Sequence, residues 1–539
     1  MKEGPTKMKS MKKLVTLLLS LVMLCALALP AMADGENDYS ITITGAKDHT
    51  YTAYQVLSGV YFHGDGNNNT DANKEYLSDI KWGDAIDQTK ILVNLQASAI
   101  IGSDFTGEKT AEEVAYILQG YANKSEKLDE FARIVNNSLK AGVAGKSSGV
   151  VGEDKKATIS DLTAGYYFVK DTGTIGAGEI ATKFLVKVVG NATVDIKADA
   201  PTIDKKIVDN GDTNRTTANI GDKVEFKLTA KVPDMANFDT YTFTISDTLS
   251  KGLTFNKDSV EVKIGDTKLT ADTNYTLGDL NTSTNTFTVT FTKTQLANYV
   301  LHGTGATIVV TYNATLNSYA LTTDKETNTA KLEYSNNPSS STDKGTITTP
   351  DVPTYIYNFN INVDKYDGTD GTTNTDKKLK DAVFVLYRLN GATTKEYYKW
   401  DATTGKITWV PANDNPTQKT TDVNGKATFE GLKEGTYYLE EIKAPDGYNK
   451  LKNPVPVEIK AAYNEDGTLK TDDADFKLKP DTTKNNHYYQ LQSIANKAGA
   501  VLPSTGGIGT TIFYVLGSIL ALGAAVLLIA KKRMNGQDR

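Results

Sequence analysis

The chain has 539 residues, of which 39% are hydrophobic and 23% charged, and its formal net charge of −6 at pH 7 argues against a nucleic-acid-binding surface. It has one cysteine, Cys25, and four scattered histidines with neither an HExxH motif nor a paired spacing. These counts argue against a disulfide framework and a Cys/His metal site, so we expect neither a cofactor nor a metal.

The chain begins with a segment typical of a secretory signal peptide. Lysines precede the apolar run from Leu14 to Leu29, and Ala31-Met32-Ala33 has the small–x–small form of a cleavage site. A membrane anchor is disfavoured for two reasons: the apolar run is short, and a cleavage site follows it. We therefore expect residues 1–33 to be removed from an exported protein, with room for roughly three domains after them.

Residues 34–198 combine strand and helix patterns. "ITITGA" and "TYTAYQVLSG" alternate as strands do, and "ATISDLTAGYYFVKD" and "KFLVKVVG" return to that pattern. Between them, "TAEEVAYILQGYANK" opens with a capping box, Thr110 and Glu113, and "SEKLDEFARIVNNSLKAG" predicts a second helix ending at a glycine. We predict an N-terminal α+β domain.

The rest of the exported chain is mainly β. In "YTFTISDTL" the side chains at 241, 243, 245, 247 and 249 share one face, and "TFTVTFT", "NTAKLEYSN", "FNINVDK" and "DAVFVLYRL" are further strand patterns. The polar, proline-bounded "NNPSSSTDKGTITTPDVP" separates two groups of strands. We predict tandem Ig-like β-sandwich domains at residues 199–353 and 354–500.

Residues 501–539 form a three-part ending. The motif "LPSTG" is followed by an uncharged stretch of about 23 residues, Ile508 to Ala530, which is long enough for a membrane helix, and then by a basic tail. The motif consists of Leu502, Pro503, Ser504, Thr505 and Gly506.

Three ionisable side chains fall on apolar strand faces. Lys205, Asp247 and Lys365 each follow the alternation of buried neighbours, although a lone buried charge costs several kcal/mol. One interpretation is that they lie at strand ends and reach solvent. The other is chemical: a desolvated lysine becomes a neutral nucleophile, a carboxylic acid polarises the amide of an asparagine, and an isopeptide bond forms with loss of ammonia.

Several of these segments resemble domains of Gram-positive pilins. "YYLEEIKAPDGY" resembles the pilin E-box, with Glu441 at its acid position, and "FNINVDKYDG" and "IANKAGAVLPSTGG" resemble the first and last strands of a collagen-adhesin B-type domain. The resemblance implies a Lys365–Asn496 isopeptide bond assisted by Glu441. Periodicity does not place Asn496, because its strand has polar residues on both faces.

A second resemblance concerns the middle of the chain. "PTIDKKI", "YTFTISDTLSKGLTF" and "NTAKLEYSNNP" resemble the isopeptide-forming middle domain of fimbrial subunits. This implies a Lys205–Asn328 bond assisted by Asp247. Lys206, on the opposite strand face, and Asn336, which shares parity with Asn328, are the alternatives.

Taken with the "LPSTG" ending, the chain resembles the backbone (shaft) subunits of sortase-assembled pili. This implies cleavage after Thr505, transfer of its carboxyl group to a lysine of an identical subunit, and final attachment to peptidoglycan on a Gram-positive surface. The implied partners are class C and housekeeping sortases, tip and basal pilins, and host surface ligands. Lys197, in "NATVDIKADAPT", occupies the place of the acceptor lysine, although the Tyr-Pro of the family's YPKN-like motif is missing. The other candidates are Lys170, Lys183 and Lys187.

Other functions remain open from the sequence. The main alternative is a monomeric LPXTG wall-anchored adhesin, and a tip or basal pilin is a third. An extracellular enzyme is disfavoured, since no catalytic constellation appears apart from the self-cross-links. "DGNNNTD" resembles a calcium loop, but it lacks the glycine and the terminal glutamate of an EF-hand, so we interpret it as a polar loop.

Overall fold

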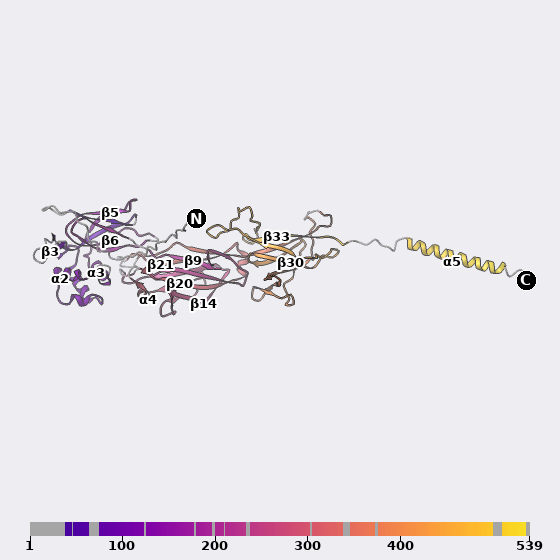
Figure 1. Cartoon of the computed structure of the whole chain (residues 1–539), viewed down its shortest axis with the longest axis horizontal. Helices are drawn as coiled ribbons and strands as arrows, with labels where there is room; N and C mark the ends of the chain where they lie inside the picture. Colours follow the sequence, from indigo (N-terminus) through magenta and orange to yellow (C-terminus); the bar gives the residue numbers. More distant parts are fainter. Residues whose placement is uncertain are drawn as a thin grey trace, which may run out of the picture.

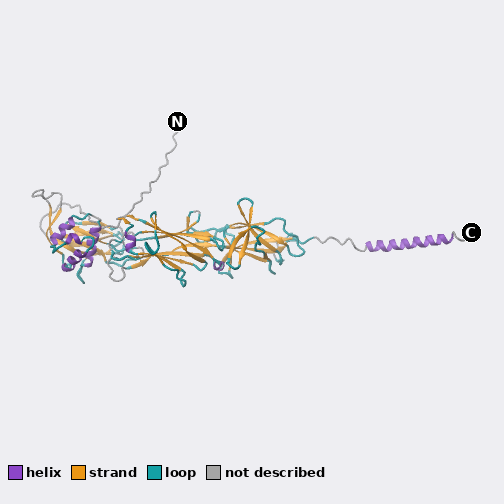
Figure 2. Cartoon of the chain, turned by 90° about the horizontal axis from the view of Figure 1, so that it is seen from below, coloured by secondary structure: helices purple, strands orange, loops and turns teal. Residues whose placement is uncertain are grey.

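The computed structural model describes residues 38–45, 47–63, 75–122, 125–176, 179–196, 200–209, 211–232, 235, 238–301, 304–337, 345–371, 376–499 and 509–534. The predicted signal peptide, the calcium-like loop, Lys197 and the "LPSTG" motif lie outside the described residues. Three structural units follow one another along the long axis in chain order (Figure 1). Helices gather in the N-terminal unit, whereas strands dominate the two units that follow it (Figure 2).

The N-terminal unit is α+β, as predicted. One sheet has the strand order β5–β1–β8 and the other β3–β2–β6–β7, with β4 paired to β2. The strands are β1 (Tyr39–Thr44), β2 (Thr50–His63), β3 (Glu75–Trp82), β4 (Lys146–Val150), β5 (Lys156–Leu162), β6 (Gly165–Asp171), β7 (Lys183–Val188) and β8 (Ala192–Asp195). The helices are α1 (Gln88–Ala97), the 3₁₀ turn η1 (Gly102–Phe105), α2 (Ala111–Gln119) and α3 (Glu126–Asn137).

The predicted capping box starts α2. Thr110 Oγ1 accepts a hydrogen bond from the Glu113 backbone at 3.2 Å, and the Glu113 carboxylate accepts one from the Thr110 backbone at 2.8 Å. Helix α3 ends at Asn137, before the glycine at which its sequence pattern ends. Two residues after the helix, Leu139 forms a β-bridge with Ile86.

The middle unit is built from two sheets, one of six strands and one of seven. Their orders are β10–β9–β12–β20–β14–β15 and β11–β23–β21–β13–β17–β16, with β22 paired to β21. The first sheet contains β9 (Ile203–Val208), β10 (Asp212–Thr213), β12 (Lys223–Lys231), β14 (Leu253–Ile264), β15 (Thr267–Lys268) and β20 (Thr307–Leu316). The second contains β11 (Arg215–Thr217), β13 (Phe243–Leu249), β16 (Thr276–Leu277), β17 (Thr286–Phe291), β21 (Glu326–Ser335), β22 (Thr346–Thr348) and β23 (Val352–Tyr357).

Short elements complete the middle unit. They are α4 (Lys293–Ala297), the hairpin of β18 (Val300–Leu301) and β19 (Thr304–Gly305), and the 3₁₀ turn η2 (Ser318–Thr322). Strand β13 has the burial alternation that its sequence predicts, with Phe243, Ile245, Asp247 and Leu249 all buried. The interior of the unit therefore includes a carboxylate.

The C-terminal unit also has two sheets. Their orders are β29–β24–β33–β32 and β27–β26–β25–β30–β31, with β28 paired to β25. The first contains β24 (Phe359–Asp367), β29 (Lys426–Leu432), β32 (Lys479–Asp481) and β33 (His487–Asn496). The second contains β25 (Val383–Asn390), β26 (Thr394–Asp401), β27 (Lys406–Val410), β28 (Lys419–Thr420), β30 (Gly435–Lys443) and β31 (Val455–Ile459).

The two β-units share one apolar core. A single buried cluster includes Phe226 of the middle unit and Phe429 of the C-terminal unit, whereas the N-terminal unit has a core of its own. Backbone hydrogen bonds also cross the junction: Ile220 donates to Gly431 at 2.9 Å, and Ile407 donates to Ile220 at 2.9 Å. Strand β23 pairs within the middle unit and spans the predicted boundary at 353/354, and β24 begins the next unit two residues later.

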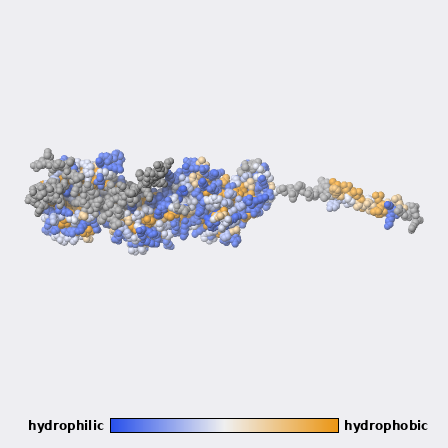
Figure 3. Space-filling view, viewed as in Figure 1, coloured by the Kyte–Doolittle hydropathy of each residue, from blue (hydrophilic) through white to orange (hydrophobic). Residues whose placement is uncertain are grey.

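Helix α5 (Gly509–Met534) follows the C-terminal unit. Its stretch Ile512–Met534 is long and apolar enough to cross a membrane, and none of it is buried against the rest of the chain. Its surface is largely hydrophobic, in contrast to the mostly hydrophilic surface of the β-units (Figure 3). The last turns carry Lys531, Lys532 and Arg533, which matches an anchor with a basic end.

Candidate functional site

The middle unit buries a lysine, a carboxylate and an asparagine together. Lys205 lies on β9 of one sheet, and Asp247 and Asn328 lie on β13 and β21 of the other. In the antiparallel register Asn328 is opposite Leu249, two residues beyond Asp247, so both side chains project from the same face. All three residues are 0% exposed, so these polar groups lie between the sheets and not at a wet strand end.

Short hydrogen bonds connect the members of this middle cluster. Lys205 Nζ lies 2.6 Å from each carboxylate oxygen of Asp247 and donates to the Tyr312 hydroxyl at 3.0 Å. Tyr312 donates to Asp247 Oδ2 at 2.6 Å and accepts from Asn328 Nδ2 at 2.5 Å. Through Tyr312, both the acid and the amine are connected to the amide.

Aromatic rings enclose the lysine. Its Nζ lies 5.0 Å from the ring centre of Phe226 and 5.5 Å from that of Tyr312. Burial lowers the pKa of Lys205 to about 8, although the neighbouring Asp247 acts in the opposite direction. A neutral, nucleophilic amine is thereby accessible near physiological pH.

Tyr312 is the member of the middle cluster that the sequence interpretation missed. It lies on β20, where it belongs to the buried alternation of Ile308, Val310, Ala314 and Leu316. A tyrosine on such a face passes for an ordinary core residue, because its ring is apolar. A search for every side chain with a polar atom on a core face would have found it.

The structure keeps the two alternative residues out of the middle cluster. Lys206 points away from Asp247, and its Nζ donates to Asn214 Oδ1 at 2.7 Å. Asn336 follows the end of β21, where its backbone oxygen accepts from Ala181 of the N-terminal unit at 2.7 Å. Lys205 and Asn328 are therefore the pair that the fold places around one carboxylate.

The C-terminal unit buries a second set. Lys365 on β24 and Asn496 on β33 belong to adjacent parallel strands, in which Lys365 is opposite Ile494 and Asn496 is opposite Asp367. This offset of two residues puts both side chains on one face. Glu441 approaches from β30 of the other sheet, and the three residues are 0–2% exposed.

In this C-terminal cluster the acid binds the amide directly. Asn496 Nδ2 donates to Glu441 Oε2 at 3.1 Å, and the Leu451 backbone donates to the same oxygen at 2.8 Å. Lys365 Nζ lies 3.7 Å from Glu441 Oε1 and donates to the backbone oxygen of Ile494 at 3.2 Å. Burial lowers the pKa of Lys365 to about 8, against the opposing effect of Glu441.

Both clusters leave the amide oxygen open. Among the described residues, Asn328 Oδ1 and Asn496 Oδ1 are buried and have no hydrogen-bond partner. An unsatisfied buried carbonyl is costly. The mechanism expected from the sequence has the carboxylic acid polarise the amide group of the asparagine. In this structure neither Asp247 nor Glu441 contacts an asparagine oxygen: Asp247 contacts Lys205 Nζ, and Glu441 contacts Asn496 Nδ2.

The candidate acceptor lysines of the N-terminal unit differ in burial. Lys183 begins β7 opposite Lys170 on β6 and is 3% exposed. Burial lowers its pKa to about 7, and burial also lowers the pKa of Lys170. The Lys183 side chain is so enclosed that it cannot enter the active site of an enzyme that joins subunits unless the fold around it opens locally.

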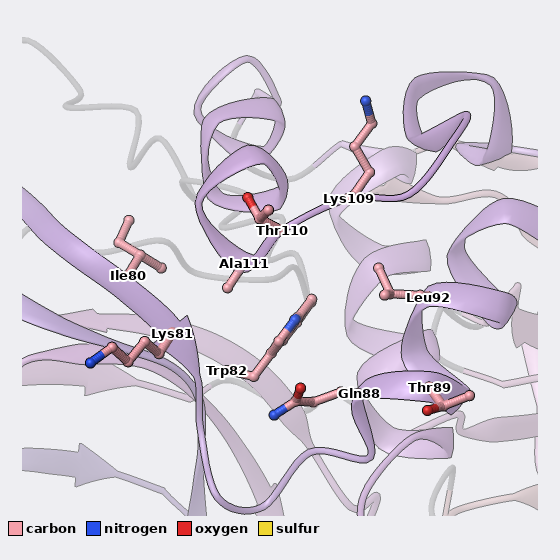
Figure 4. Close-up of a pocket in the computed structure, with 9 residues that line it drawn as sticks. All are labelled: Ile80, Lys81, Trp82, Gln88, Thr89, Leu92, Lys109, Thr110 and Ala111. Carbon is pink, nitrogen blue, oxygen red and sulfur yellow. The ribbon is translucent and has the colours of Figure 1, made fainter.

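A groove in the N-terminal unit lies between β3, α1 and α2 (Figure 4). It encloses about 660 Å³. It is lined by Ile80, Lys81, Trp82, Gln88, Thr89, Leu92, Lys109, Thr110 and Ala111. The amino groups of Lys81 and Lys109 point away from Trp82 in Figure 4. The lining residues include no carboxylate and no histidine, so the groove adds no acid–base pair to the chemistry above.

A buried histidine of the N-terminal unit contacts two carboxylates near the junction with the middle unit. His49 Nδ1 lies 2.5 Å from Asp171 Oδ2, and Nε2 lies 3.3 Å from Glu179 Oε2. The Glu179 backbone oxygen accepts a hydrogen bond from the Tyr334 hydroxyl of β21 at 3.3 Å. The hydrogen bond to Asp171 is the main reason why the pKa of His49 is raised above 6.5, and burial opposes it.

This histidine predicts a pH-dependent stability. Because its pKa is higher in the folded chain, the stabilisation is complete below about pH 6.5 and is lost as the pH rises through the folded-state value. We expect the amides of β2 and β6 to be better protected at pH 6 than at pH 8 in hydrogen-exchange measurements, after correction for intrinsic exchange rates. His49→Gln should remove this difference. An equal pH dependence in the variant would assign it to other groups.

Three family models match the chain. The model of the Gram-positive pilin backbone subunit 2, Cna-B-like domain, matches residues 220–338, and a SpaA prealbumin-like fold domain matches residues 359–475. An LPXTG cell wall anchor motif matches residues 494–536. The matched segments contain Asp247, Asn328, Lys365 and Glu441 and, in the anchor match, Asn496.

Two characterised relatives are similar in sequence. The trypsin-resistant surface T6 protein of Streptococcus pyogenes serotype M6 is 27% identical over 423 residues, which cover 66% of this chain and 74% of that protein. The fimbrial subunit type 1 of Actinomyces viscosus is 30% identical over 132 residues, which cover 24% of this chain and 20% of that protein.

Solved structures of pilins also align with the chain. The T6 backbone pilin of serotype M6 Streptococcus pyogenes aligns with a TM-score of 0.49 at 18% identity, over 87% of this chain and 95% of that one. The full-length major pilin SpaD from Corynebacterium diphtheriae aligns with a TM-score of 0.47 at 21% identity, over 87% and 100%.

Proposed function

This chain is a Gram-positive pilus backbone subunit with an LPXTG cell-wall anchor, and from that premise we propose that it is polymerised covalently by sortase and strengthened by two internal isopeptide bonds. The proposed bonds join Lys205 to Asn328 and Lys365 to Asn496, with Asp247 and Glu441 as the assisting acids. The observation that supports them is the complete burial of each lysine, carboxylate and asparagine in one contact network.

The chemistry needs no cofactor. In each cluster the lysine ammonium passes a proton to the carboxylate, and the neutral amine then attacks the side-chain amide carbon. Ammonia leaves, and the new amide replaces a buried ion pair by a neutral group. Since an unreacted buried pair has a large desolvation cost, the fold favours the product.

The proposed polymer connects the ends of the cross-linked region. A class C sortase would cleave between Thr505 and Gly506 and transfer the Thr505 carboxyl group to Lys197 of the next subunit. A housekeeping sortase would finally transfer the fibre to peptidoglycan. Tension would then enter at 197 and leave at 505, and both internal bonds lie between these points. The N-terminal domain, proposed as residues 34–198, would hang outside that path.

Intact-protein mass spectrometry tests the internal bonds. Each bond expels one ammonia, so a recombinant region from Asp34 to Leu502 should weigh about 34 Da less than its sequence. Lys205→Ala should reduce the deficit to about 17 Da, whereas the matched change Lys206→Ala, on the neighbouring outward-facing side chain, should leave it unchanged. A mass equal to the sequence mass would exclude both bonds.

A further inference from the structure

The hydroxyl group of Tyr312 contacts every reacting group of the middle cluster. It lies 3.0 Å from Lys205 Nζ, 2.6 Å from Asp247 Oδ2 and 2.5 Å from Asn328 Nδ2. We infer that Tyr312 is a catalytic residue of the Lys205–Asn328 reaction, in which it passes a proton from Asp247 to the departing nitrogen of Asn328. This inference rests on the isopeptide bond proposed above.

The position of Asp247 makes a relay necessary. Both of its oxygens lie 2.6 Å from Lys205 Nζ, so the acid is placed to take a proton from the amine. Tyr312 is the side chain that hydrogen-bonds Asn328 Nδ2 within the described part of the chain. A proton held by Asp247 therefore reaches the leaving group through the tyrosine hydroxyl.

The C-terminal cluster has the opposite arrangement. There Glu441, with one more methylene group than aspartate, accepts a hydrogen bond from Asn496 Nδ2 at 3.1 Å and lies farther from its lysine, at 3.7 Å. That acid can protonate the leaving nitrogen without help. The departing asparagine nitrogen is thus protonated directly by Glu441 in the C-terminal cluster and through the Tyr312 hydroxyl in the middle cluster.

Packing fixes the hydroxyl group in place. The Tyr312 ring stacks on Phe226 at 5.2 Å and meets Phe287 and Phe255 edge-on at 4.9 and 5.6 Å. Burial is the main reason why the pKa of Tyr312 lies well above 10. The phenol therefore keeps its proton and can donate one proton while it accepts another, as a relay requires.

The steps balance without an external reactant. Lys205 first gives a proton to Asp247, and its neutral nitrogen bonds to the side-chain carbonyl carbon of Asn328. Tyr312 then gives its proton to the former amide nitrogen and takes one from Asp247. The positively charged lysine nitrogen returns a proton to Asp247, the carbon–nitrogen bond to the leaving group breaks, and the carbonyl re-forms. The products are one secondary amide, one ammonia and a protonated Asp247.

The test compares the rates of the two bonds within one molecule. Wild-type and Tyr312→Phe chains covering residues 34–502 are made in a cell-free system, translation is stopped, and intact mass is followed with time. We expect Tyr312→Phe to form the Lys365–Asn496 bond at the wild-type rate. Its middle bond should form about 10²-fold more slowly or not at all, which is the usual scale of a lost general acid. Tryptic mapping assigns each 17 Da loss to its domain.

A packing control separates the hydroxyl group from the ring. Phe255→Leu disturbs the packing of the Tyr312 ring but removes no polar atom and leaves the Phe226 ring beside Lys205 in place, so its middle bond should still form much faster than that of Tyr312→Phe. If Tyr312→Phe fails to fold, the time course of the wild-type chain in D₂O tests whether the Tyr312 hydroxyl relays a proton. A relay predicts a larger solvent isotope effect for the middle bond than for the C-terminal one, read after back-exchange into H₂O.

The outcomes distinguish the two proposals. A middle bond that forms at the same rate in wild type and Tyr312→Phe, or equal isotope effects for both bonds, would overturn the role of Tyr312 and leave the bond itself standing. A wild-type chain that never loses mass in the middle domain would instead refute the proposed Lys205–Asn328 bond.

Discussion

Replacing Glu441 with alanine is expected to leave Lys365 and Asn496 unlinked and to lower the melting temperature of the C-terminal β-unit by on the order of 10 °C or more. Two effects combine. In the variant the Lys365 amine stays unreacted in a site that is 0% exposed, without the Glu441 carboxylate that lies 3.7 Å from it in the wild-type fold, and an uncompensated buried charge of this kind costs about 3–5 kcal/mol. The cross-link across a loop of more than a hundred residues is also lost, which by analogy with disulfides is worth roughly 4–5 kcal/mol.

Calorimetry and intact mass together measure this result. Glu441→Gln keeps the shape of the side chain but cannot take up the proton, so we expect it to abolish the bond as well. Glu440→Ala is the matched control, because Glu440 is the preceding residue on β30 and its carboxylate is part-exposed, where it accepts a hydrogen bond from Tyr397. A full deficit of about 34 Da in Glu441→Ala would show that Glu441 does not assist the reaction.

The second large effect concerns polymer formation. We expect Lys197→Arg to abolish the high-mass ladder that wall extracts boiled in SDS should show, while monomers stay folded, internally cross-linked and attached to the wall. Arginine keeps the positive charge, but its guanidinium does not deprotonate and so offers no amine nucleophile. Tandem mass spectrometry of wild-type fibres should reveal a branched peptide that joins Thr505 to the Lys197 side chain.

The other lysines of the N-terminal unit serve as comparisons. Lys187 lies on β7, and Lys187→Arg should leave the ladder intact. Lys183→Arg should also leave it intact if the variant folds, because Lys183 is buried. An undiminished ladder in Lys197→Arg would move the acceptor to another lysine. A single anchored band in the wild-type strain, with its own sortases present, would favour a monomeric adhesin.

Local sequence patterns already predict which side chains share a strand face with apolar residues. Strand alternation depends only on the backbone geometry of single strands. It placed Lys205, Asp247 and Lys365 on apolar faces but left open whether they reach solvent at strand ends, and the structure buries all three. The capping box at Thr110 is equally local, since its two hydrogen bonds join residues three apart. The apolar stretch of α5 follows from composition alone.

Which of the inward-facing groups meet depends on how the strands pair and how the sheets pack. Asn496 lies on a strand with polar residues on both faces, and it reaches Glu441 because β33 pairs in parallel with β24 in one particular register. Tyr312 enters the middle cluster because β20 lies two strands from β9 and its ring crosses the core to the opposite sheet. Contacts of this kind depend on strand order, register and the packing of two sheets. They join residues that are far apart in the sequence, by 55 positions for Asn496 and Glu441 and by 107 for Lys205 and Tyr312. Periodicity within a single strand carries no information about them.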